Sequence, residues 1–125
     1  IDVHMEVLQS DGGTRVAAIT AAGVALADAG IPMRDLPCGV SVGKIEGEFL
    51  VDLDKYEDNL GGCDIPMIFS QRTGELLLYQ MDGMLTRDEV RQTVSLGFGA
   101  VKRIREVQVQ ALKQKYEAAK TQVNE

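Results

Sequence analysis

The chain has 125 residues, enough for one domain with one hydrophobic core. Its formal net charge is −6, which argues against free nucleic-acid binding by this chain alone, because such binding usually depends on a basic surface. No apolar run has the length needed to cross a membrane, so we expect no membrane contact.

The two cysteines, Cys38 and Cys63, lack the spacing of a metal site. We expect them to be reduced thiols of a cytoplasmic protein. The chain opens at Ile1 inside a strand-like pattern, so we also expect it to be part of a longer protein.

The first predicted elements are a strand and a helix. Residues 1–8 alternate apolar and polar side chains, which is the pattern of a half-buried strand. A loop follows at residues 10–13. Residues 14–29 are rich in alanine and contain no proline, so they predict a helix that Gly30 and Pro32 would end.

Two hairpins are predicted next. Residues 38–45 and 48–53 flank a Glu-Gly turn, and residues 63–69 and 75–81 flank a turn that contains glycine. Their apolar runs indicate strands that contribute to one sheet.

The last predicted element is a long helix. Thr86 and Glu89 have the spacing of a capping box, in which each side chain binds a free amide at the start of a helix. The sequence turns polar from about residue 113, so we expect a domain over residues 1–112 and a polar helical tail over residues 113–125 that frays or projects. The predicted order, β-α-β-β-β-β-α, is that of an α+β fold.

Residues 10–15 are a candidate anion-binding loop. The amides of Gly13, Thr14 and Arg15 lie at the predicted helix start, where they would be free to face an anion, and glycine permits close approach of the backbone. The hydroxyl of Thr14 and the charge of Arg15 would add to such a site. The alternative is a plain loop in which Asp11 or Thr14 caps the helix.

Asp58 and Asp64 are candidate catalytic or metal-binding residues. They lie on either side of a Gly-Gly bend, beside predicted strand ends, where carboxylates can hold Mg²⁺ or supply a proton. The alternative is a solvated acidic loop. Three neighbouring acids compete for the same role: Asp52, Asp54 and Glu57.

Several motifs in order then resemble the second half of an RNase PH domain, over roughly residues 1–115. This family includes bacterial RNase PH, polynucleotide phosphorylase and the exosome core ring. The motifs are Val7–Arg15, Ala25–Met33, Gly43–Glu48, Asp52–Leu53, Glu57–Asp58 and Asp64. Within the family, Gly30–Leu36 and Leu78–Gly83 are most similar to the catalytic ring subunit of the archaeal exosome.

The resemblance implies phosphorolysis, in which inorganic phosphate, the co-substrate, attacks the last phosphodiester of an RNA 3′ end. The family's phosphate loop falls on Gly13, Thr14 and Arg15. Its two acidic positions fall on Asp58, as the acid, and Asp64, as a ligand of Mg²⁺ or Mn²⁺. Asp58 could protonate the leaving 3′-oxygen if the charge of Asp64 raises its pKa.

The resemblance also implies partners. The family's first half, which carries arginines for phosphate and RNA, is absent here. The resemblance implies a hetero-hexameric ring with a second RNase PH-like subunit, and RNA-binding cap proteins in addition. Pro66 stands where polynucleotide phosphorylase has a lysine. We therefore expect the isolated chain neither to bind RNA tightly nor to degrade it.

Two other functions fit the same family. One is a bacterial-type RNase PH that trims tRNA 3′ ends, which a ring with one kind of subunit would favour. The other is a non-catalytic RNA-binding ring subunit. The joint presence of Asp58, Asp64 and the Gly13–Arg15 loop weighs against the second, because a purely structural subunit does not need all of them.

Overall fold

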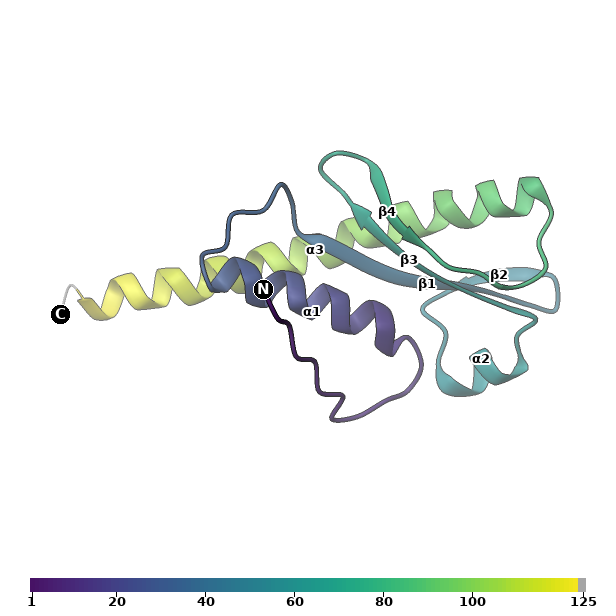
Figure 1. Cartoon of the computed structure of the whole chain (residues 1–125), viewed down its shortest axis with the longest axis horizontal. Helices are drawn as coiled ribbons and strands as arrows, with labels where there is room; N and C mark the ends of the chain where they lie inside the picture. Colours follow the sequence, from purple (N-terminus) through teal and green to yellow (C-terminus); the bar gives the residue numbers. More distant parts are fainter. Residues whose placement is uncertain (124–125) are drawn as a thin grey trace.

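The computed structural model describes residues 1–123, in which an antiparallel sheet lies between two helices (Figure 1). Helix α1 (Thr14–Asp28) covers one face and the long helix α3 (Arg87–Val123) the other. The strand order is β2-β1-β3-β4, and the short strand β5 also pairs with β3. The remaining elements are β1 (Pro37–Ile45), β2 (Glu48–Val51), α2 (Lys55–Leu60), β3 (Cys63–Ser70), β4 (Glu75–Tyr79) and β5 (Asp82–Gly83). In the part of the chain that is described, no helix combines the length and apolar character of a membrane span.

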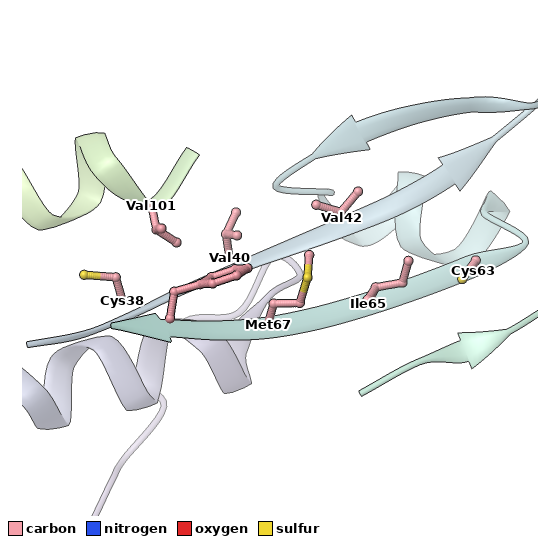
Figure 2. Packing of buried hydrophobic residues seen from close by; sticks show 8 residues of the cluster. Cys38, Val40, Val42, Cys63, Ile65, Met67 and Val101 are labelled. Carbon is pink, nitrogen blue, oxygen red and sulfur yellow. The ribbon is translucent and has the colours of Figure 1, made fainter. Parts of the chain in front are cut away.

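The main core lies between the sheet and α3. Side chains alternate between the faces of a strand, so every second residue of β1 and β3 points toward α3. These residues are buried and pack against Val101 of α3 (Figure 2). They are Cys38, Val40 and Val42 of β1 and Cys63, Ile65, Met67 and Phe69 of β3.

Helix α1 packs closely on the opposite face. A Cβ atom at Gly39 would lie 2.7 Å from the carbonyl oxygen of Val16, so only glycine permits this approach. The amide of Gly39 donates to Thr20 Oγ1 at 2.9 Å. From α3, the buried Gln108 donates to the carbonyl oxygens of Thr20 and Pro37 at 3.0 and 3.2 Å. These bonds fix α1, and thus its N-terminus, relative to the sheet.

The α+β fold class, the helix and the two hairpins predicted from the sequence are confirmed. So is the capping box, because Glu89 Oε2 accepts from the amide of Thr86 at 2.7 Å and the amide of Glu89 donates to Thr86 Oγ1 at 3.3 Å. Helix α3 continues through the predicted tail as far as Val123, and Lys115 Nζ binds the carboxylate of Asp28 at 2.6 Å. Residues 124–125 of that predicted tail lie outside the described residues.

The predicted first strand is wrong. Residues 1–10 are exposed and form no strand. A strand needs a neighbour for its amide and carbonyl groups, and no described strand pairs with this segment. The segment instead runs beside α1, where residues 3–9 and the alanine face of that helix line a cavity of about 440 Å³.

The predicted order also lacked α2 and β5. Helix α2 begins at Asp54, whose carboxylate accepts from the amides of Tyr56 and Glu57, both at 2.8 Å. Glu57 forms the reciprocal hydrogen bond, since its Oε2 accepts from the amide of Asp54 at 2.9 Å. The segment expected to be a loop around Asp58 is therefore a short, capped helix.

Candidate active site

The loop before α1 leaves its amides free. Gly13 is the N-cap residue, with φ of 57°, and no described side chain caps the helix. The alternative in which Asp11 or Thr14 is the cap is therefore wrong. In the first helical turn, the amides of Thr14 and Arg15 have no acceptor within the helix. Gly12, with φ of 86°, lets the loop lie directly against the backbone of Leu53.

One cavity of about 380 Å³ gathers all five predicted site residues. Gly13, Thr14 and Arg15 line it from the start of α1, Asp58 from α2 and Asp64 from β3. Its remaining walls come from Ser10, Gly12, Ser41, Lys55, Asn59 and Pro66. The cavity thus joins the start of α1 to α2 and to the middle of the sheet, which are far apart in the sequence.

The two carboxyl groups occupy different settings. Asp58 is exposed on α2, whereas Asp64 is half-buried near the start of β3. Burial raises the pKa of Asp64, and the charge of Asp58 raises it further; a hydrogen bond with Ser41 and the charge of Arg15 oppose this. The charges of the two carboxyl groups are thus coupled.

None of the three competing acids is among the described residues that line the cavity. Asp54 and Glu57 form the capping box of α2, so their oxygens are already used by backbone amides. Asp52 has a left-handed backbone, with φ of 65°, and is not among the residues that line the cavity. Helix capping therefore explains two of the three acids.

Comparison with known proteins shows to which protein family the chain is related. The model of the 3′ exoribonuclease family, domain 2, matches residues 35–100, and the model of its domain 1 matches residues 1–32. The chain belongs to the RNase PH family. It is 53% identical over 116 residues to the exosome complex component Rrp41 of Thermoplasma acidophilum and, over the same length, to that of Pyrococcus furiosus.

These matches cover 93% of this chain but 47% and 46% of the relatives, so the chain spans about half the length of the curated relatives it matches. It corresponds to their second half. Among solved structures, rice Rrp46 is similar, with a TM-score of 0.80 at 27% identity, over 86% of this chain and 51% of that one. The RNase PH-like fold predicted from the sequence is thereby confirmed.

The cavity lies where the two RNase PH family regions meet. Gly13, Thr14 and Arg15 fall in the region matched by domain 1, and Asp58 and Asp64 fall in the region matched by domain 2. Folding of α1 onto the sheet is therefore what brings the two groups together.

Sequence reasoning missed four polar residues of this RNase PH site. Ser41 faces Pro66 across β1 and β3, and Arg15 Nη1 donates to Gln80 Oε1. Both relations are long-range and leave no local signal. Lys55, in contrast, lies three positions before Asp58 and four before Asn59. A correct prediction of α2 would have shown that Lys55 neighbours both residues on the helix surface.

The donor set suits a hard divalent cation. Mg²⁺ is usually held by one or two carboxylates together with substrate phosphates and water. Asp58 and Asp64 offer two carboxylates beside the free amides of the loop, and the described residues contain no group of three or more histidine, cysteine or acidic ligands that would hold a metal alone. The residues fit a metal that binds together with phosphate.

Proposed function

We propose that this chain forms part of a catalytic subunit of an archaeal-type exosome core, which degrades RNA from its 3′ end by phosphorolysis. The observation that carries the proposal is one cavity that is lined by both the candidate anion-binding loop and two aspartates. Membership of the 3′ exoribonuclease family and the similarity to Rrp41 support the same reaction class.

In the proposed reaction, an oxygen of inorganic phosphate attacks the phosphorus of the last phosphodiester. The bond from phosphorus to the 3′-oxygen breaks, which releases a nucleoside 5′-diphosphate and leaves a shortened RNA with a 3′-hydroxyl. Such transfers depend on positioning and on charge stabilisation. The amides of Thr14 and Arg15, with the Arg15 guanidinium, would hold the attacking phosphate.

The carboxyl pair would supply two functions. One proton must reach the leaving 3′-oxygen, and Asp58 faces the cavity from an exposed helix where it can deliver that proton. Asp64, with Asp58, would hold Mg²⁺ or Mn²⁺, which offsets the negative charge of two neighbouring phosphates when bound.

The rest of the machinery must come from elsewhere. The net charge of −6 and the match to about half of each relative imply that further basic groups lie outside these residues. We propose that these come from the domain's first half, a second RNase PH-like ring subunit and RNA-binding cap proteins. Native mass spectrometry of the purified assembly would identify such chains.

The test uses the native assembly with a single-stranded RNA that carries a 3′-hydroxyl. Release of nucleoside diphosphates should require inorganic phosphate and should stop when a chelator removes the divalent cation. Asp58→Asn and Asp64→Asn should each lower kcat by 100-fold or more, in line with the loss of an acid or of a charge-stabilising group.

Asp88→Asn is the matched control, because Asp88 is an exposed acid on α3 whose carboxylate pairs, among the described residues, with Arg91 alone. Its activity should equal that of the unaltered protein. Release of nucleoside monophosphates without phosphate, or unchanged rates in both cavity variants, would contradict the proposal.

A further inference from the structure

We propose that a second cavity, bounded by Arg34, Arg72 and Arg105 at the C-terminal end of α1, binds a phosphate group. This cavity measures about 440 Å³ and is separate from the candidate active site. Its wall contains three guanidinium groups and a single carboxylate, Asp35, on a chain whose overall charge is −6. It is thus a local positive site on an acidic protein.

The carboxylate neutralises only one of the three cations. Arg105 donates to Asp35 Oδ1 through Nε and Nη2 at 3.2 and 3.1 Å. The guanidinium groups of Arg34 and Arg72 form no ion pair with any residue whose side chain is described. Two positive charges on the cavity wall therefore remain without a counter-ion.

Asp35 also makes the wall rigid. Its Oδ2 accepts from Ser70 Oγ at 3.0 Å and from the backbone amide of Arg72 at 2.8 Å, and its side chain is 4% exposed. The loop after α1, the β3–β4 turn and α3 are thereby joined at one point. The backbone that carries Arg34 and Arg72 is held in place, which lowers the entropic cost of closing both guanidinium groups on one anion.

Phosphate is the anion that this wall fits best. A guanidinium group offers parallel N–H donors that match two oxygens of one phosphate, so arginine is preferred where phosphate is recognised. The apolar residues of the cavity, among them Ile31, Met33 and Leu112, leave few polar alternatives to these donors.

The position of the second cavity relative to the candidate active site suggests that the phosphate belongs to a bound RNA. Asp64 and Ser70 lie on the same face of β3, six residues and so about 20 Å apart. One cavity is lined by residues at the N-terminal end of α1, Gly13–Arg15, and the other by Ala27 near its C-terminal end. Helix α1 is 15 residues or about 22 Å long. If the proposed function holds, an RNA with its 3′ end at Asp58 spans this distance with about six stacked nucleotides.

The experiment compares two double variants of the native assembly, neither of which touches the candidate active site. Arg34→Gln/Arg72→Gln removes the free cations of the cavity. Arg87→Gln/Arg103→Gln removes two exposed arginines of α3 that do not line it, so both variants change the net charge equally. Binding of a fluorescent 12-nucleotide RNA and of a 4-nucleotide RNA is measured between 50 and 200 mM salt, without phosphate or divalent cation.

We expect the cavity variant to bind the 12-nucleotide RNA at least fivefold more weakly, with a salt slope shallower by about 0.7 for each lost phosphate contact. The 4-nucleotide RNA and the control variant should be unaffected. Because no turnover is measured, this result is independent of whether the proposed phosphorolysis is correct.

A second arm distinguishes free phosphate from the RNA backbone. Line broadening of inorganic phosphate in ³¹P NMR is measured in an Arg15→Gln background, which weakens the other anion site. Loss of broadening in the cavity variant, with unchanged RNA binding, would assign the site to free phosphate. If the cavity variant matches the control in both arms, the proposal is wrong.

Discussion

The guanidinium of Arg15 and the side-chain amide of Gln80 are hydrogen-bonded, although 65 positions separate them. Arg15 belongs to the first turn of α1, and Gln80 follows β4. The backbone amide of Gln80 donates to the carbonyl oxygen of Pro66 at 3.1 Å. Gln80 is therefore held by the sheet, and it positions the Arg15 side chain beside the cavity before any anion binds.

Replacement of Gln80 should test this positioning role. In Gln80→Ala, Arg15 loses a partner worth about 1 kcal/mol, so the KM for phosphate should rise roughly fivefold while kcat changes less. Phosphate-dependent kinetics on the native assembly would measure both values, with the exposed Gln92→Ala as control. An unchanged KM would show that Arg15 is positioned by other contacts.

Asp64 should weaken the fold at neutral pH. Because its pKa is raised, the folded state holds this proton more tightly than the unfolded state, so stability falls as pH rises through the raised pKa. Without divalent cation, Asp64→Asn should therefore raise Tm at pH 7 by about 3 °C, equivalent to roughly 1 kcal/mol. The gain in Tm should shrink below the ordinary pKa of aspartate, and a lower Tm at pH 7 would refute the argument.

Asp35 should stabilise the fold at neutral pH, in contrast to Asp64. Burial acts to raise its pKa, but hydrogen bonds from the amides of Arg72 and Leu36 and from Arg105 and Ser70 outweigh burial and lower it. A lowered carboxyl pKa contributes stability above the ordinary value of about 3.9, and this is lost as pH falls through the lowered value. Asp35→Asn should cost about 2 kcal/mol at pH 7 and much less near pH 2 in urea unfolding. Equal losses at both pH values would contradict this.

Gly12 should be the least replaceable glycine of the anion-binding loop. An alanine Cβ there would lie 2.4 Å from the carbonyl oxygen of Leu53, in addition to the strain of a positive φ. Gly47 has a similar φ of 90° but open space around it, so Gly47→Ala should cost only about 1 kcal/mol. Gly12→Ala should cost roughly 3 kcal/mol and displace the loop, lowering phosphate-dependent activity more than tenfold. Chemical denaturation and kinetics would compare the two variants.

Local patterns were sufficient for most of the fold. The alanine-rich run of α1, the turns of the two hairpins and the capping box at Thr86 each have their signal within a few residues. Helix α2 had such a signal too, because Asp54 and Glu57 have capping-box spacing. The prediction lacked this helix because its acidic residues were assigned to catalysis or metal binding. Two of them, Asp54 and Glu57, instead accept hydrogen bonds from backbone amides at the helix start.

Features that depend on distant residues could not be predicted. The alternation in residues 1–8 shows that the segment can be a strand but not whether a neighbouring strand exists. The bond from Arg15 to Gln80, and the shared cavity of Gly13 and Asp64, depend on how α1 docks on the sheet. The resemblance brought these residues together only because related proteins share the fold.

The exposed N-terminal segment has a consequence for the solution behaviour of the isolated chain. No described strand pairs with this segment, and Val3, Met5 and Val7 alternate with polar residues while each is more than 40% exposed. An unpaired segment with this alternating pattern can form β-pairs with the same segment of another molecule. The isolated chain should therefore self-associate as its concentration rises, and Met5→Lys, which places a charge in the middle of the segment, should keep it monomeric in sedimentation experiments.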